Sequence, residues 1–285
     1  MNIQRIGVVG SGTMGGAIAH LAALSGFQVI LCDVADAFLN KARQRMETLM
    51  DKSVEKGKMT ADQKAEVLSR IVFTTRLEDL KPVQVVIEAI IENLEAKKEL
   101  FHQLDELLPP DVLIASNTSS MSVTVLAEAT KRQHLVAGMH FFNPPQVMKL
   151  VEVVRGFKTG DDTVRQLKEL AIRFGKDPIE VKKDSPGFIV NRVMIPQFIE
   201  AIRLVEEGVA SPEDVDKAIV LGLNYPMGPF TLQDFAGVDI GLNVMDYFYE
   251  EFKDDRFAAP LSLRRLVRAG RLGKKTGAGW YDYNK

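Results

Sequence analysis

The chain has 285 residues, more than a single hydrophobic core usually organises, so we expect a large domain and a smaller one. A formal net charge of −2 excludes the strong basic excess that is typical of nucleic-acid-binding proteins. The single cysteine, Cys32, excludes an internal disulfide and a cysteine-rich metal site, and we expect no bound metal. The sequence contains no run of about 18 apolar residues and no removable targeting segment, which predicts a cytoplasmic protein without a membrane span.

The first two thirds of the chain alternate between strand-like and helix-like segments. The expected strands are residues 3–9, 27–32, 71–73, 83–87, 112–115, 135–139, 150–154 and 178–181. The expected helices are residues 15–25, 35–56, 60–70, 94–108, 123–129 and 164–174. Two of these helices follow one another without a strand between them, which predicts an inserted helical hairpin. The alternation predicts an α/β fold, a Rossmann-like and mostly parallel sheet with helices on both faces.

The pattern changes near residue 186, after which no convincing strand follows. Residues 188–205 are apolar at helical spacing, with Pro196 as an expected kink. Ser211 followed by Pro212 is a strong helix start, and residues 240–252 and 263–269 continue the helical signal. We therefore expect a Rossmann domain over residues 1–185 and a smaller all-α C-terminal domain over residues 186–285.

A glycine-rich turn directly follows the first expected strand. Gly10, Gly12 and Gly15 fit G-x-G-x-x-G, in which the glycines permit a tight turn, close approach of a pyrophosphate, and close packing of the next helix. Free N–H groups at the start of that helix can bind phosphates. The second strand ends at Asp33, whose carboxylate can accept hydrogen bonds from ribose hydroxyls and would repel a 2′-phosphate. The segment therefore predicts an NAD site, with NAD favoured over NADP.

His140 follows the expected strand 135–139, at the edge of the sheet where ligands bind in open α/β folds. Oxidation of an alcohol needs a base for the hydroxyl proton, and histidine has a suitable pKa for this role. Glu152 lies in the next apolar strand, where a buried carboxylate needs a partner, and a nearby imidazole could provide it. The alternatives are a structural histidine and an acid at a strand edge that faces water.

Seven motifs together resemble the 3-hydroxyacyl-CoA dehydrogenase family, and most closely its short bacterial 3-hydroxybutyryl-CoA members. They cover nearly the whole chain in the family's order. The motifs are Gly10-Ser11-Gly12-Thr13-Met14-Gly15, Ser116-Asn117-Thr118-Ser119-Ser120, His140-Phe141-Phe142-Asn143-Pro144, Met148-Lys149-Leu150-Val151-Glu152-Val153, Pro186-Gly187-Phe188-Ile189-Val190-Asn191-Arg192, Pro226-Met227-Gly228-Pro229 and Gly273-Lys274-Lys275-Thr276-Gly277.

The resemblance implies an NAD-dependent oxidoreductase that interconverts (S)-3-hydroxyacyl-CoA and 3-oxoacyl-CoA in a cleft between two domains. It implies His140 as the catalytic base with Glu152 as its carboxylate partner, and Ser119 and Asn191 as the groups that hold the substrate oxygens. Lys56 is a candidate contact for the CoA phosphates, although a solvated lysine is the alternative. The implied cofactor-binding residues are Gly10, Gly12, Thr13, Met14, Gly15, Asp33, Glu92, Lys97, Asn117, Ser119, Asn143 and Lys275.

The apolar circumference of residues 188–205 has two interpretations, contact with a partner chain or burial within one chain. The family resemblance implies a homodimer formed through the helical domain. Two other functions remain open at this point. One is a β-hydroxyacid dehydrogenase whose base is a lysine on the second domain, and the other is an NAD-binding protein without catalysis.

Overall fold

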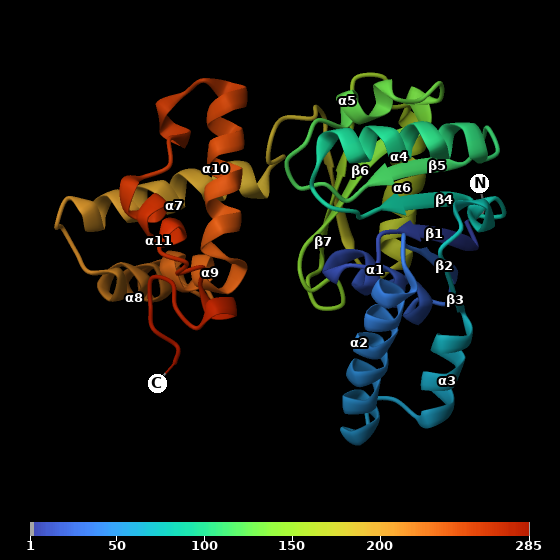
Figure 1. Ribbon diagram of the computed structural model, residues 1–285, viewed down its shortest axis with the longest axis horizontal. Helices are drawn as coiled ribbons and strands as arrows, with labels where there is room; N and C mark the ends of the chain where they lie inside the picture. Colours follow the sequence, from blue (N-terminus) through green and yellow to red (C-terminus); the bar gives the residue numbers. More distant parts are fainter. Residues whose placement is uncertain (1–2, 285) are drawn as a thin grey trace. The chain divides into compact units, whose positions relative to one another are not determined.

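The computed structural model describes residues 3–284, and the chain divides into two compact units at the Ser185–Pro186 bond. The first unit is an eight-stranded sheet in the order β3-β2-β1-β4-β5-β6-β7-β8, with helices packed against it (Figure 1). All neighbouring strands are parallel except β6 and β7. The strands are β1 (Arg5–Val9), β2 (Gln28–Cys32), β3 (Ile71–Thr74), β4 (Val85–Glu88), β5 (Leu113–Ser116), β6 (Val136–Phe141), β7 (Leu150–Val154) and β8 (Asp177–Val181).

Six helices of the first unit connect these strands. They are α1 (Thr13–Leu24), α2 (Asp36–Glu55), α3 (Ala61–Ser69), α4 (Leu94–Leu107), α5 (Val123–Glu128) and α6 (Asp161–Arg173). Apolar residues of α1, α2 and α6 share one buried core with the strands, which are themselves almost fully apolar. Parallel strands covered on both faces bury both sets of side chains, which explains these continuous apolar runs. The predicted Rossmann-like, mostly parallel sheet is confirmed.

The helical hairpin predicted between the strands is also present, as α2 and α3 between β2 and β3 (Figure 1). Thr60 begins α3 with a reciprocal capping box, in which its hydroxyl accepts from the Gln63 backbone N–H and the Gln63 side chain accepts from the Thr60 backbone N–H. Leu39, Met46 and Met50 of α2 are buried against the first unit. The hairpin is therefore packed onto the Rossmann core along one side of α2.

The second unit is helical, and no β-strand longer than an isolated bridge occurs between residues 186 and 284. Buried aromatic residues form its centre, with the rings of Phe248 and Phe257 in edge contact at 5.4 Å between centroids. No helix of the described residues is long and apolar enough to cross a membrane. The helices are α7 (Val190–Glu206), α8 (Pro212–Leu223), α9 (Pro229–Ala236), α10 (Val238–Phe252) and α11 (Leu261–Arg268).

Several expected boundaries were wrong by one to three residues, and three of them have a clear consequence or cause. The helix expected from residue 188 begins at Val190, because Phe188 has a left-handed φ of 51° that an α-helix cannot contain. The helix expected from residue 164 begins at Asp161, where two acidic residues occupy its first turn. The strand expected to end at residue 139 continues to Phe141 and thus includes His140. In addition, α9 was not predicted, because its eight residues are too short for a clear periodic signal.

Candidate active site

The carboxyl ends of β1, β4, β5 and β6 lie along one edge of the sheet, because these strands are mutually parallel. The loops that leave this edge carry most of the predicted site residues of the first unit. The glycine-rich turn follows β1, residues 89–93 follow β4, residues 117–122 follow β5, and residues 142–149 follow β6. The topology thus gathers segments that lie up to about 130 residues apart in the sequence.

The glycine-rich turn needs two of its glycines for its own geometry. Gly10 has a φ of 97°, and a Cβ added there would lie 2.5 Å from the Ala89 carbonyl oxygen. A Cβ added to Gly15 would lie 1.8 Å from the Gly10 carbonyl oxygen, so the helix could not pack against the turn. A Cβ on Gly12, by contrast, would meet no atom within 4 Å. Packing within the chain does not require glycine at position 12, whereas close approach of a ligand does.

The start of α1 fits the pyrophosphate of NAD. Gly12 and Thr13 are exposed, no side chain caps the helix, and no acidic residue occupies its first turn. The backbone N–H groups of that turn therefore remain accessible to an anion, with the partial positive charge of the helix end behind them. The residues present fit the predicted cofactor.

Asp33 follows β2 and also organises the turn. Its Oδ2 accepts hydrogen bonds from the Ser11 backbone N–H at 2.6 Å and from the Ser11 hydroxyl at 2.7 Å. Its Oδ1 accepts from the Val34 backbone N–H at 2.7 Å. Because a carboxylate offers about four acceptor positions, one remains on Oδ1 for a ribose hydroxyl. The predicted ribose contact is compatible with this geometry, and the contact to Ser11 was not foreseen.

Glu92 and Lys97 belong to a buried charged network centred on Glu88, the last residue of β4. The Lys97 ammonium lies 2.5 Å from Glu88 Oε1 and 3.1 Å from Glu92 Oε2. Glu88 also accepts from the Ser116 hydroxyl at 2.6 Å, and Glu88 and Lys97 are at most 1% exposed. Isolated charges are costly to bury, so the pair depends on its mutual contact. Lys97 thus directs Glu92, which is 41% exposed, toward the edge of the sheet.

The loop after β5 contacts both neighbouring strand ends. The Thr118 hydroxyl donates to Glu92, and the Ser119 backbone N–H lies 3.4 Å from the same oxygen. Asn117 Oδ1 accepts from the Phe141 backbone N–H at 3.0 Å, directly beside His140. Asn117 and Ser119 therefore lie between the Glu92 network and the strand that carries the candidate base.

His140 and Glu152 are directly opposite each other in the antiparallel β6–β7 pair. His140 Nδ1 lies 2.7 Å from Glu152 Oε2, and the two side chains are 7% and 0% exposed. The Phe142 ring lies 4.6 Å from the imidazole, centroid to centroid. The predicted pairing of these two residues is confirmed, and strand register rather than a flexible loop sets its geometry.

Asn143 is exposed in the loop that follows, and Gln146 anchors this loop to α1. The Gln146 side-chain amide donates to the Ala17 carbonyl oxygen at 3.2 Å and lies 3.4 Å from His20 Nδ1. Burial lowers the pKa of His20 to about 4, so its ring is neutral near pH 7 and can accept from that amide. The loop with Asn143 is therefore tied to the helix that begins at the glycine-rich turn.

Three predicted residues lie outside this edge. Lys56 is exposed directly after the last residue of α2, in the connection between α2 and α3. Asn191 is the second residue of α7, and the Lys275 ammonium lies 2.6 and 2.7 Å from the two oxygens of Asp239. Asn191 and Lys275 belong to the second unit, and their part in the site stays a prediction.

Three functional candidates were missed by sequence reasoning. Glu88, like Asp33, is an acid at the end of an apolar strand, and this pattern in the sequence could have identified it. Gln146 had no recognisable signal, because its contacts lie 126 and 129 residues away in the chain. Arg45 donates to the carbonyl oxygens of Ser11 and Gly12, a contact that only the packing of α2 creates.

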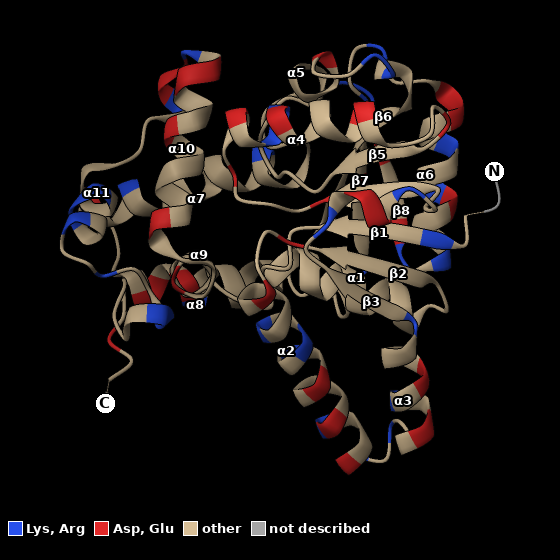
Figure 2. Cartoon of the chain, turned by 45° about the vertical axis from the view of Figure 1, so that its right-hand side comes forward, with Lys and Arg blue, Asp and Glu red and all other residues tan. Residues whose placement is uncertain are grey.

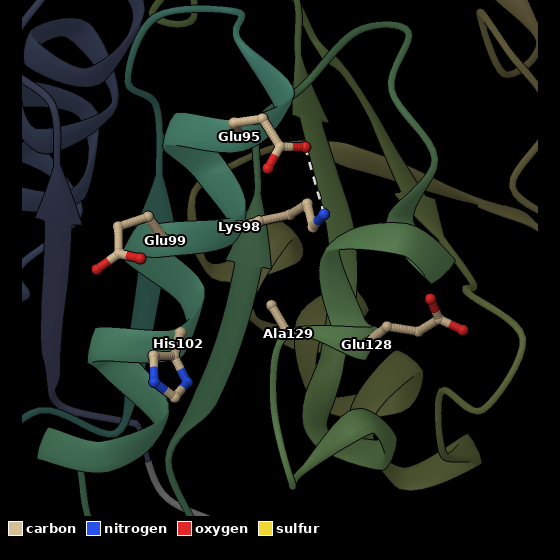
Figure 3. A pocket seen from close by; sticks show the side chains of 6 residues that line it. All are labelled: Glu95, Lys98, Glu99, His102, Glu128 and Ala129. Carbon is tan, nitrogen blue, oxygen red and sulfur yellow. Dashed lines mark hydrogen bonds and ion pairs between the residues drawn. The ribbon is translucent and has the colours of Figure 1, made fainter.

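A surface groove of about 400 Å³ between α4 and α5 does not coincide with this edge (Figure 3). Its only internal ion pair joins Lys98 and Glu95 at 3.3 Å, and both side chains are solvent-exposed. None of its lining residues was predicted for the site. They are Glu95, Lys98, Glu99, His102, Glu128 and Ala129.

Comparison with known families agrees with the two units. Residues 5–185 match the profile "3-hydroxyacyl-CoA dehydrogenase, NAD binding domain", and residues 187–283 match "3-hydroxyacyl-CoA dehydrogenase, C-terminal domain". The chain belongs to the 3-hydroxyacyl-CoA dehydrogenase family. The site described above is therefore that of a family of oxidoreductases whose cofactor is NAD.

Individual relatives in this family match over their whole length. A probable 3-hydroxybutyryl-CoA dehydrogenase of Deinococcus radiodurans is 46% identical over 98% of this chain and 100% of its own. A 3-hydroxybutyryl-CoA dehydrogenase of Clostridioides difficile is 44% identical over 99% of this chain and 100% of its own. The crystal structure of (S)-3-hydroxybutyryl-CoA dehydrogenase from Ralstonia eutropha superposes with a TM-score of 0.96 at 44% identity, with full coverage of both chains.

Proposed function

We propose that the chain interconverts (S)-3-hydroxybutyryl-CoA and acetoacetyl-CoA with NAD(H). The observation that carries the proposal is the buried pair of His140 and Glu152, 2.7 Å apart at the sheet edge of an NAD-binding domain. The names of the full-length relatives support the choice of a short acyl chain. A fold alone is compatible with many reactions, whereas these two side chains favour proton transfer from an alcohol.

In this proposal His140 is the general base. NAD, when bound, accepts the hydride from C3 of the substrate. Because Nδ1 faces Glu152, the proton of the 3-hydroxyl is transferred to Nε2. The imidazolium that forms lies against a carboxylate that is shielded from water, where their attraction is strongest. Glu152 also holds the ring in one orientation, because it is fixed by the strand pairing.

In this proposal the remaining candidate residues bind and orient the substrate and the cofactor. Ser119 and Asn191 hydrogen-bond the substrate oxygen as it becomes a carbonyl. Glu92, held by Lys97, and Asn143 orient the cofactor at the sheet edge, and Lys275 is a further cofactor-binding residue. Lys56 contacts the CoA phosphates.

The two rival functions predict different chemistry. A lysine base on the second domain would leave the buried His140–Glu152 pair without a purpose, although its burial is costly to maintain. A binding protein without catalysis would likewise have no use for an imidazole against a buried carboxylate. Both rivals are therefore less well supported than the dehydrogenase.

The activity is tested by mixing the purified protein with acetoacetyl-CoA and NADH and following NADH absorbance. We expect steady consumption of NADH, and we expect the reverse reaction with (S)-3-hydroxybutyryl-CoA and NAD. A comparison of kcat/KM across acyl-CoAs of increasing length tests the preference for a short chain. Binding of NADH without its consumption would contradict the dehydrogenase and favour a binding protein.

We also propose that the chain forms a homodimer through its second unit. One side of α7 is buried within that unit, which accounts for part of its apolar circumference within one chain. The buried residues are Ile195, Phe198, Ile199, Ala201 and Ile202. Large apolar side chains nevertheless remain exposed on the second unit, on α7 itself and on other helices, and several such side chains together can mark a surface that a partner covers. They include Val193, Leu221, Leu223, Phe235 and Ile240.

Sedimentation of the purified protein tests the dimer. We expect a mass of twice 31.7 kDa at micromolar concentration. Leu221→Glu, at a side chain that is 73% exposed, should shift the equilibrium toward the monomer without loss of folding. A single monomeric species for the unchanged chain would disprove the proposal.

A further inference from the structure

The glycine-rich turn is held by a side chain from the inserted hairpin. Arg45 lies on α2, and its Nη2 donates to the Ser11 carbonyl oxygen at 2.8 Å and lies 3.3 Å from the Gly12 carbonyl oxygen. The two helices lie close together at Gly16, where an added Cβ would be in ordinary contact with the Ala42 Cβ at 3.4 Å and with Arg45 Nη2 at 3.6 Å. The guanidinium is thus brought to the turn by close packing of α1 against α2.

The same turn is held from a second direction by Asp33. Asp33 accepts from the N–H and the hydroxyl of Ser11, while Arg45 donates to the carbonyl oxygen of Ser11. Arg45 and Asp33 together thus fix the backbone at Ser11 from two directions. Arg45 therefore helps to orient the turn in the form in which it can bind phosphate.

Arg45 also keeps its charge available. It forms no ion pair with any residue between 3 and 284, and its recorded hydrogen bonds involve Nη2 alone. The N–H groups on Nε and Nη1 remain available as donors. Phosphate and carboxylate oxygens are the acceptors that a guanidinium group prefers. The residue is exposed beside Gly12, the position that the chain leaves open for a ligand.

Arg43, on the same helix, is an arginine whose charge is paired with an acidic side chain. Acidic and basic residues are interspersed along α2 (Figure 2), and Arg43 pairs with Glu47 at 3.1 Å. Arg43 also lies over the Phe73 ring, 5.5 Å from its centroid. Arg43 is thus a neutralised surface residue, whereas Arg45 is an unneutralised cation at the turn.

We propose that Arg45 is a cofactor-binding residue that contacts a phosphate group of the dinucleotide. This proposal rests on the NAD site of the proposed function and adds a residue outside the G-x-G-x-x-G motif to it. The phosphate belongs either to the pyrophosphate, which all these dinucleotides share, or to the 2′-phosphate, which only NADP carries. In the second case Arg45 would offset the repulsion by Asp33 and allow the chain to use both cofactors.

Binding is measured without turnover, by titration with ADP-ribose, NADH and NADPH at two salt concentrations. We expect Arg45→Gln to weaken binding about tenfold, with a smaller salt dependence than the unchanged chain shows. Arg45→Lys should restore much of the loss, because it keeps the charge. Arg43→Gln is the matched control and should leave all three dissociation constants unchanged.

The arms of the experiment separate the two sources of phosphate. Equal weakening of ADP-ribose, NADH and NADPH assigns the contact to the pyrophosphate, and weakening confined to NADPH assigns it to the 2′-phosphate. Unchanged binding of all three ligands by Arg45→Gln would overturn the proposal. So would equal weakening by Arg45→Gln and Arg45→Lys with a lowered Tm, because this would assign Arg45 to the structure of the turn alone. If the unchanged chain bound the dinucleotides but did not reduce acetoacetyl-CoA, this result would instead count against the proposed function.

Discussion

His140→Gln is expected to lower kcat for acetoacetyl-CoA reduction by about 10²–10⁴-fold while binding of NADH is retained. Glutamine keeps hydrogen-bonding groups next to Glu152 but cannot exchange a proton with the substrate oxygen at neutral pH. The glycine-rich turn follows β1 and Asp33 follows β2, whereas His140 lies on β6, so the cofactor site should be preserved. Steady-state rates and NADH fluorescence titration measure the two properties separately.

A second histidine provides the control for this experiment. His102 is 54% exposed on α4, and His102→Gln should leave kcat unchanged. Glu152→Gln should also lower kcat, and the double variant should be little slower than His140→Gln alone, because residues that act as a unit are not additive. A rate for His140→Gln within about twofold of the unchanged chain would remove His140 from the role of base.

Lys97→Met is expected to lower the free energy of unfolding by about 3–5 kcal/mol, since it leaves the Glu88 carboxylate buried without its cation. Methionine matches the length of the lysine stem, so the effect reports the missing charge rather than a cavity. The same change releases Glu92 from Lys97, and we therefore expect weaker NADH binding as well. Chemical denaturation and NADH titration measure these two effects.

The neighbouring lysine is the matched control. Lys98 lies on the same helix, 39% exposed and paired with Glu95, so Lys98→Met should change the unfolding free energy by less than about 0.5 kcal/mol. The double variant Glu88→Gln/Lys97→Met should recover part of the loss, because it leaves no unpaired charge in the interior. Equal stability of the Lys97 and Lys98 variants would show that the buried pair does not support the fold.

Much of the fold was predictable from sequence because its signals are local. All eight strands and the six helices of the first unit were expected, since apolar runs and helical spacing reflect burial by a covered parallel sheet. Two of the errors arose where a single backbone conformation or a short element decided the outcome. Phe188, with its left-handed φ, delayed α7, and the eight residues of α9 carried too little periodicity.

The candidate site was predictable to a smaller degree. His140 and Glu152 were candidates individually, because a strand-end histidine and a buried carboxylate each carry a local chemical signal. Glu88 carried the same signal and was overlooked. Gln146 and Arg45 were not predictable, because a polar residue on an exposed loop or a charged helix resembles any solvated side chain.

By itself the sequence determined the nucleotide-binding turn and the residue types available for catalysis. The constraint on Gly15 is steric and local, because an added Cβ would collide with the Gly10 carbonyl oxygen, whereas at Gly10 it would collide with Ala89 of a distant segment. Tertiary structure alone decided which of these residues meet. The antiparallel register of β6 and β7 places His140 opposite Glu152, and packing of α2 on α1 brings Arg45 to the turn. These contacts depend on strand pairing and helix packing between distant segments, for which no short sequence pattern is sufficient.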